Sequence, residues 1–114
     1  MLLGRVIGTV WATRKDEKLE GFKMLIVRAV DLDLKPLSTF VVAVDTVQAG
    51  LGELVLVTQG SSARQTKETN NKPVDAVVIA IVENFDFSSM EKLEREFQQR
   101  QEPIAKRLAM VPEV

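Results

Sequence analysis

Five short runs rich in β-branched and apolar residues dominate the first 85 positions, and little room is left between them for helices. No intervening stretch offers the roughly ten or more helical residues that a parallel crossover connection needs. We therefore expect an all-β core, mainly antiparallel and closed or half-closed as a small barrel. Turn-forming Gly, Pro, Asn or Asp residues separate the runs, which lie at residues 2–13, 22–30, 40–44, 53–58 and 74–83.

Several of these runs are apolar on both faces. The second run places Met24 and Ile26 on one side and Leu25 and Val27 on the other, because side chains alternate along a strand. A barrel interior covers only one of those sides, and large exposed apolar patches on soluble proteins mark interfaces. We therefore expect the chain to form an oligomer.

The chain changes character at residue 86. Ser88 and Glu91 have the spacing of a capping box, and helical spacing continues from there, which predicts a helix to about Gln101. Pro103 is expected to interrupt it. A weaker apolar pattern follows and ends near Pro112. We therefore divide the chain into a barrel at residues 1–85 and a helical extension at 86–114. The apolar residues at helical spacing in the extension are Met90, Leu93, Phe97, Ile104, Leu108 and Met110.

The composition excludes most enzyme chemistry and two classes of partner. The sequence contains no Cys and no His, so thiolate nucleophiles, Cys/His zinc sites and histidine bases are absent. Its 15 basic and 16 acidic residues leave a net charge of −1, which does not favour nucleic acid. The longest apolar run, residues 76–82, is too short to cross a membrane. We expect a cytoplasmic protein without catalytic activity, cofactor or metal.

Two glycine-containing segments resemble ligand loops, but ordinary turns and caps explain them better. Gly50 and Gly52 form a GxG without the third glycine of a dinucleotide loop, so a turn that needs positive φ is favoured. The segment GSSAR at 60–64 follows a strand and leads into RQTKET, where a short helix is expected to start with a serine cap. Its backbone amides could instead bind a small anion.

A few acidic and aromatic residues are candidates for a functional site. Asp45, Glu53 and Asp75 lie near strand ends but are too scattered to define a catalytic or metal site. Asp45 is expected to form an Asx-type turn or an interface hydrogen bond. Trp11 and Phe22 could stack on bases, but no basic stripe accompanies them, and we interpret them as packing residues.

Three stretches carry a family resemblance when they are considered together. They are DTVQAGLGELVLV at 45–57, GSSARQ at 60–65 and KPVDAVVIAIVE at 72–83, and the first two strands, with GRVIGTVWATRK and KMLIVRAVD, agree with them. In this order and spacing the sequence resembles the EutN/CcmL type of bacterial microcompartment vertex protein over about residues 1–85. Gln48 departs from the glycine often found before the turn in that family.

The resemblance implies a five-stranded barrel similar to the oligonucleotide-binding fold, with a short helix after the fourth strand. It further implies a cyclic homopentamer that caps the vertices of a microcompartment shell in the cytoplasm, beside hexameric shell proteins. By the same resemblance Gly60, Ser61 and Ser62 would line a narrow central pore, and Asp45 and Arg64 would lie near subunit contacts.

Many relatives stop soon after the fifth strand, so the role of residues 86–114 is not implied. We expect this segment to dock on its own barrel or on a neighbour in the ring. An encapsulated enzyme or another shell partner is the alternative. For the chain as a whole, the alternatives are a nucleic-acid-binding module and a pentamer that binds small anions.

Overall fold

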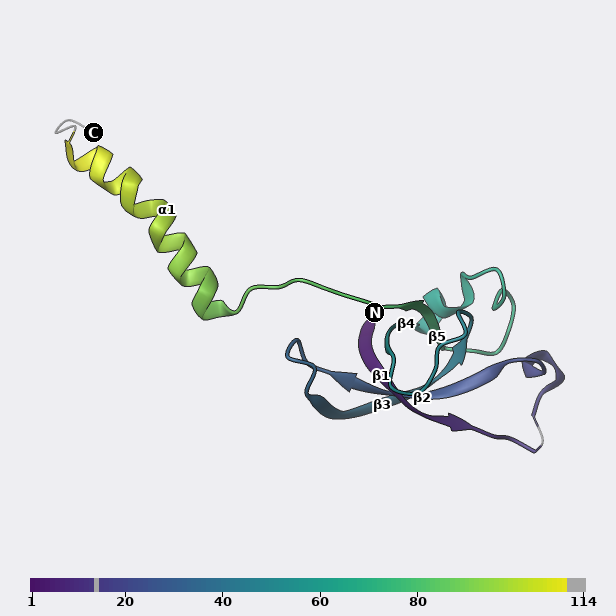
Figure 1. Cartoon of the computed structure of the whole chain (residues 1–114). Helices are drawn as coiled ribbons and strands as arrows, with labels where there is room; N and C mark the ends of the chain where they lie inside the picture. Colours follow the sequence, from purple (N-terminus) through teal and green to yellow (C-terminus); the bar gives the residue numbers. More distant parts are fainter. Residues whose placement is uncertain (14, 111–114) are drawn as a thin grey trace. The chain divides into compact units, whose positions relative to one another are not determined.

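The computed structural model describes residues 1–13 and 15–110. The chain divides after Asn84 into two compact units, a barrel unit and a helical unit (Figure 1). The elements are β1 (Leu2–Val10), η1 (Glu17–Leu19), β2 (Lys23–Val30), β3 (Pro36–Asp45), β4 (Leu54–Gln59), η2 (Gly60–Arg64), β5 (Ala76–Ile81) and α1 (Met90–Met110), where η marks a 3₁₀ helix.

The five strands close into a barrel in the order β1-β2-β3-β5-β4, which confirms the predicted fold. All neighbouring strands are antiparallel except β3 and β5, which run parallel over two residue pairs, Val44 with Val77 and Asp45 with Val78. This parallel pairing needs no helical crossover, because the chain returns from β3 to β5 through β4 and η2.

The third strand begins at Pro36, earlier than the predicted start at Phe40. Its first residues pair with the end of β2, where Arg28 lies opposite Phe40 and Val30 opposite Pro36. The Arg28 Nε also donates a hydrogen bond to the Leu37 carbonyl at 2.6 Å. Proline is tolerated at the first residue of a strand, where no ladder hydrogen bond is lost. The β2–β3 hairpin is therefore longer than its apolar pattern indicates.

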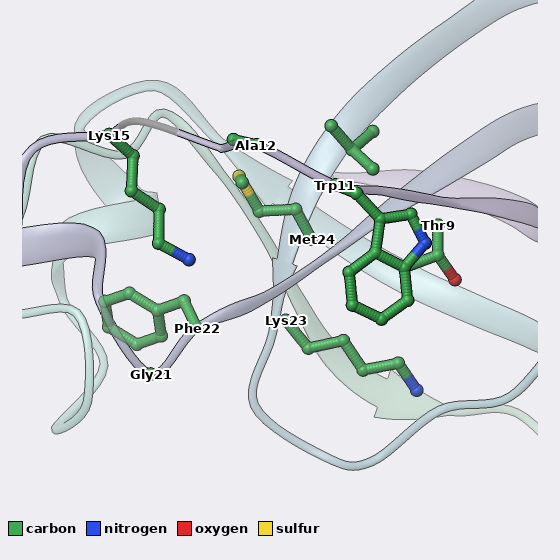
Figure 2. Close-up of a pocket in the computed structure, with 9 residues that line it drawn as sticks. Thr9, Trp11, Ala12, Lys15, Gly21, Phe22, Lys23 and Met24 are labelled. Carbon is green, nitrogen blue, oxygen red and sulfur yellow. The ribbon is translucent and has the colours of Figure 1, made fainter.

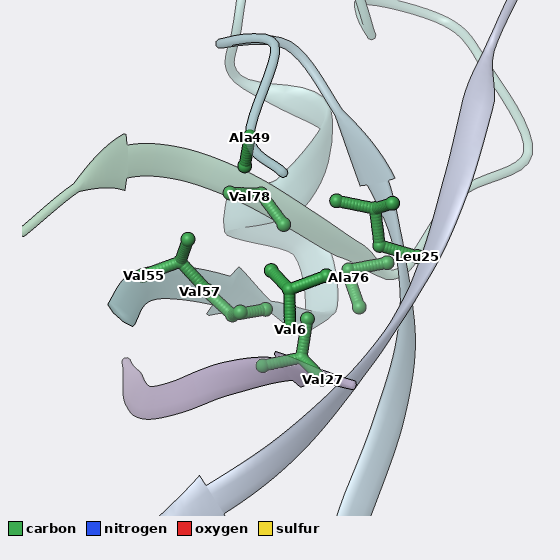
Figure 3. Packing of buried hydrophobic residues seen from close by; sticks show 9 residues of the cluster. Val6, Leu25, Val27, Ala49, Val55, Val57, Ala76 and Val78 are labelled. Carbon is green, nitrogen blue, oxygen red and sulfur yellow. The ribbon is translucent and has the colours of Figure 1, made fainter. Parts of the chain in front are cut away.

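The barrel interior is filled by small and medium apolar side chains (Figure 3). Gly4 allows β1 and β2 to approach closely, because a Cβ atom there would lie 2.8 Å from the Arg28 carbonyl oxygen. Alternation along each strand places one residue of every two in this core. Its buried members are Val6, Leu25, Val27, Ala43, Ala49, Val55, Val57, Ala76 and Val78.

A second, smaller cluster lies on the outer face of the sheet. It joins Val44 and Val77, from the paired ends of β3 and β5, to Ala63 in η2 and Val74 in the segment that follows η2. The expectation that another subunit must cover every outer apolar face was therefore wrong for this part of the barrel. Here the connection between β4 and β5 supplies the second layer.

The helical unit differs from its prediction at both ends. The helix begins at Met90, and Ser89 caps it instead of Ser88, because the Ser89 Oγ accepts a hydrogen bond from the Lys92 amide at 3.1 Å. The helix also continues through Pro103 to Met110. Proline removes one helical hydrogen bond but has a φ compatible with a helix, and its neighbours are mostly good helix formers. Pro112 lies outside the described residues.

Candidate assembly site

The residues implied for a pore form one exposed turn of 3₁₀ helix. η2 begins at Gly60, which has a φ of +66° and donates its amide to the Asp75 carbonyl at 2.8 Å. The predicted serine cap was wrong, because Gln59 occupies the cap position without a side-chain hydrogen bond and both serines lie inside the helix. Ser61 and Ser62 are exposed, whereas Ala63 is buried against the barrel.

Hydrogen bonds of Arg64 and Thr69 connect η2 to the segment between η2 and β5. Arg64 Nη1 donates to the Val74 carbonyl at 3.2 Å. Thr69, which is fully buried, donates its hydroxyl to the Ala63 carbonyl at 2.5 Å. The burial of Thr69 was not predicted from the sequence, since a threonine among polar residues gives no signal of burial. These bonds hold the exposed serines on a supported segment, and a subunit contact of Arg64 stays a prediction.

Asp45 lies at a hydrogen-bonded corner where β3 ends. Its Oδ1 accepts a hydrogen bond from the Val47 amide at 3.0 Å, which is the expected Asx turn. The side chain is only 2% exposed, and Lys23 Nζ lies 4.0 Å from Oδ2. The same ammonium group donates to the Ala49 carbonyl at 3.0 Å. A role of Asp45 at a subunit contact stays a prediction, and the shown role is to shape this corner.

The turn after this corner contains an unusual backbone conformation. Gln48 has a φ of +58° and Gly52 a φ of +83°. Positive φ at Gly52 is what the sequence predicts for this turn. At Gln48 the same left-handed region costs free energy, because a Cβ atom is present. The glycine that the family resemblance leads one to expect at this position would adopt the conformation freely.

The three acidic residues near strand ends are not gathered into a site. Glu53 Oε1 accepts the Gly50 amide at 2.6 Å, so this carboxylate stabilises its own turn. Among the side chains that the structure describes, those of residues 1–13 and 15–100, no three of His, Cys, Asp or Glu are grouped to hold a metal. Nor does the described part of the chain include a helix with the length and apolar character that a bilayer crossing needs.

Trp11 lies beside an open hollow of about 400 Å³ between the β1–β2 connection and the start of β2 (Figure 2). Its side chain is 89% exposed, so the interpretation of Trp11 as a packing residue was wrong. β1 ends at Val10, so this side chain lies past the last strand residue of β1. Phe22, on the other side of the hollow, does pack, against the outer cluster.

Four further apolar side chains gather on the outer surface of β1, β2 and β3. Ile26 lies opposite Val42 on β3 and opposite Gly8 on β1. Ile7, Phe40 and Val42 are 51%, 60% and 43% exposed. We call Ile7, Ile26, Phe40 and Val42 the outer β1–β3 patch. In contrast to the outer face of β5, this patch has no covering layer among the described residues of the barrel unit.

The chain is similar to a family of known proteins over most of its length. The family model described as "Ethanolamine utilisation protein EutN/carboxysome" matches residues 1–83. The bacterial microcompartment shell vertex protein GrpN of Rhodospirillum rubrum is 46% identical over 86 residues, covering 75% of this chain and 97% of GrpN. The carboxysome shell vertex protein CcmL of Synechocystis is 42% identical, covering 78% of this chain and 89% of CcmL.

Solved structures agree with these sequence matches. The structure of Gloeobacter violaceus CcmL has a TM-score of 0.74 and 42% identity, covering 77% of this chain and 91% of that one. The structure described as the GrpN pentameric microcompartment shell protein from Rhodospirillum rubrum has a TM-score of 0.71 and 45% identity, covering 77% of this chain and all of GrpN. The similarity therefore concerns the barrel unit.

Proposed function

The chain belongs to the EutN/CcmL family, and we propose that it is a structural subunit of a bacterial microcompartment shell, assembled as a ring of five at the shell vertices. One observation carries the proposal: the barrel unit is 46% identical to a shell vertex protein of which it covers 97%. With this function, the chain is located in the shell of a microcompartment.

The exposed apolar surface of the barrel supports assembly into a ring. A soluble monomer gains nothing from presenting Phe40 and Val42 beside Ile7 and Ile26, whereas a subunit interface would remove them from water. Burial of apolar area contributes roughly 25 cal/mol per Å², so a patch of this kind adds several kcal/mol to association. We therefore propose that the outer β1–β3 patch is buried against a neighbouring subunit.

Within such a ring, we propose that the exposed turn at Gly60, Ser61 and Ser62 lines the central pore. These residues would present hydroxyl and backbone groups to whatever passes, with no charged side chain among them. Asp45 and Arg64 would act near the subunit contacts. For Asp45 this role would include the ammonium group of Lys23, whose side chain is 51% exposed beside the buried carboxylate.

We propose that the protein is not an enzyme and that hexameric shell proteins are its neighbours in the shell. The named relatives are shell vertex proteins, and the sequence contains no histidine to activate Ser61 or Ser62 as a nucleophile. A nucleic-acid-binding module is disfavoured because basic and acidic side chains are balanced. A pentamer that binds small anions is also disfavoured, because Arg64 is the only charged side chain in η2.

Native mass spectrometry of the full chain tests the proposal. Five copies of the 12.7 kDa chain give a species of about 63.5 kDa, which we expect to dominate at micromolar concentration. A dominant monomer or hexamer would contradict the ring. Esterase turnover that Ser61→Ala or Ser62→Ala abolishes would contradict the structural role of η2.

A further inference from the structure

The strand β4 presents a second apolar face on the outside of the barrel. Val57 points into the interior (Figure 3), so alternation along the strand places Leu56, and Leu54 with it, on the outer surface. Leu56 lies opposite Leu3 on β1 and opposite Ala80 on β5. We call this surface the outer β4 face, and it consists of Leu3, Leu54, Leu56 and Ala80.

The outer β4 face has the composition of a buried interface but is not buried in the single subunit. Among the described residues, none of its four side chains belongs to either apolar cluster, and each is only half-buried. The strands β4 and β5 contain no charged residue. Arg5 lies opposite Leu54, and its Nη1 donates to the Gly52 carbonyl at 2.7 Å, before the start of β4. Interface cores are likewise depleted of charged side chains.

A closed ring of five subunits constrains how apolar surfaces can meet. Each subunit in such a ring contacts one neighbour through one surface and the other neighbour through a different surface. A contact between two copies of the outer β1–β3 patch would be complete in a dimer and would leave one of five chains unpaired. The patch of one subunit therefore needs a different apolar surface on the next subunit.

We propose that the outer β1–β3 patch of one subunit packs against the outer β4 face of the next, an inference that rests on the ring proposed above. The partner of the patch is thus a second copy of this chain. The two surfaces are centred on β2 and β4, which are not neighbours in the barrel order β1-β2-β3-β5-β4. One contact of this kind at each seam covers both apolar surfaces of every copy.

The exposure of the side chains differs between the two surfaces in a way that suits packing. Phe40 and Val42 of the patch are 60% and 43% exposed, so they project from the barrel. Leu54 and Leu56 are set more deeply, because their neighbours on the sheet half-bury them. A projecting surface packs more closely against a recessed one than against a copy of itself, and interface cores are packed as densely as protein interiors.

The absence of cysteine in the chain makes a direct cross-linking test possible. We expect rings of the double variant Val42→Cys/Leu56→Cys, treated with a short bismaleimide, to give a ladder of two to five linked chains on a denaturing gel. Leu32→Cys/Leu56→Cys is the matched control, because Leu32 is 55% exposed but lies outside the patch, between β2 and β3. We expect at least about tenfold less linked product from the control, because only the core of an interface holds two side chains in close contact.

Native mass spectrometry of the variants before cross-linking separates this inference from the proposed function. Rings of five that give no ladder, or as much product from the control, would overturn the contact and leave the ring intact. Linked dimers from Val42→Cys alone would show that two patches meet and would also overturn it. A ladder that continues past five chains would support the contact but contradict the ring. If the first double variant does not assemble, Phe40→Cys/Leu54→Cys tests the same contact.

Discussion

The barrel unit and the helix α1 differ in the exposure of their apolar side chains. In the barrel, Val6, Val27 and Val55 are no more than 1% exposed, and strands distant in sequence surround them. In the helix, every large apolar side chain whose burial is described is at least 46% exposed. The barrel therefore contains what it needs to fold, whereas α1 has a local cap and helical spacing but no layer that covers its apolar side chains among the described residues of its own unit. In proteins, most of the stability of a helix comes from packing of its amphipathic face.

The largest effect is expected from a substitution that prevents assembly of the ring but leaves the barrel folded. Val42→Asp would place a carboxylate in the outer β1–β3 patch, opposite Ile26 and not opposite a basic residue, and an unpaired charge is costly to bury at an interface. We expect at least a ~100-fold weaker association, seen as monomer in native mass spectrometry. Thr39→Asp, also exposed but on the opposite side of the strand, is the control and should still form the ring. A ring of Val42→Asp would exclude this patch from the interface.

A change within the barrel should have the next largest effect. Gly4→Ala would place a methyl group 2.8 Å from the Arg28 carbonyl oxygen and against the Val27 side chain. Overpacking of this kind costs about 1–3 kcal/mol of the free energy of unfolding. Chemical denaturation should detect it. Gly8→Ala is the control, because its methyl would meet only the tip of Ile26 at 3.3 Å and should cost less than about 1 kcal/mol.

Removal of the helix should have a smaller effect on the ring. Truncation after Phe85 deletes α1 but keeps every strand, so we expect the five-chain species to survive in native mass spectrometry. The loss of α1 should lower the stability of the barrel by at most about 1 kcal/mol, which corresponds to a decrease in melting temperature of some 4–8 °C. Unfolded or monomeric chains after truncation would show that the barrel unit needs the helical unit to fold or to assemble.

The smallest expected effect is a gain in stability at the turn after β3. Gln48→Gly would relieve the left-handed backbone at a φ of +58°, and we expect a net stabilisation of about 0.5–1 kcal/mol after the larger entropy loss of glycine. Thermal unfolding can measure it. Gln65→Gly, at a φ of −90°, has no such strain to relieve and should destabilise.

The sequence predicted best where side-chain alternation was visible. Leu25 and Val27 fill the interior as their alternation requires, and the resemblance added the closure of the barrel and the family. The start of β3 at Pro36 was missed because that part of the hairpin has little apolar alternation. The burial of the outer face of β5 could not be predicted either, since it depends on how a polar loop folds back.

Some features of the candidate site could also be predicted from the sequence, and others could not. The Asx turn at Asp45 follows from local chemistry, and so it could be predicted. The exposure of Trp11 could not, because it depends on where β1 stops pairing. At Pro103 the low helix propensity of proline predicted a break in the helix. The one missing hydrogen bond did not outweigh the helix-forming residues on either side.

The parallel seam between β3 and β5 has a consequence for the folding pathway of the barrel. Only two residue pairs close it, and they are separated along the chain by β4 and η2. The entropy of closing such a loop must be overcome before any contact across the seam contributes, so antiparallel hairpins are expected to form first and the seam last. By the same reasoning, the amide hydrogens that bond β3 to β5 should exchange with solvent through a partial opening of the barrel that leaves the β1–β2–β3 meander intact.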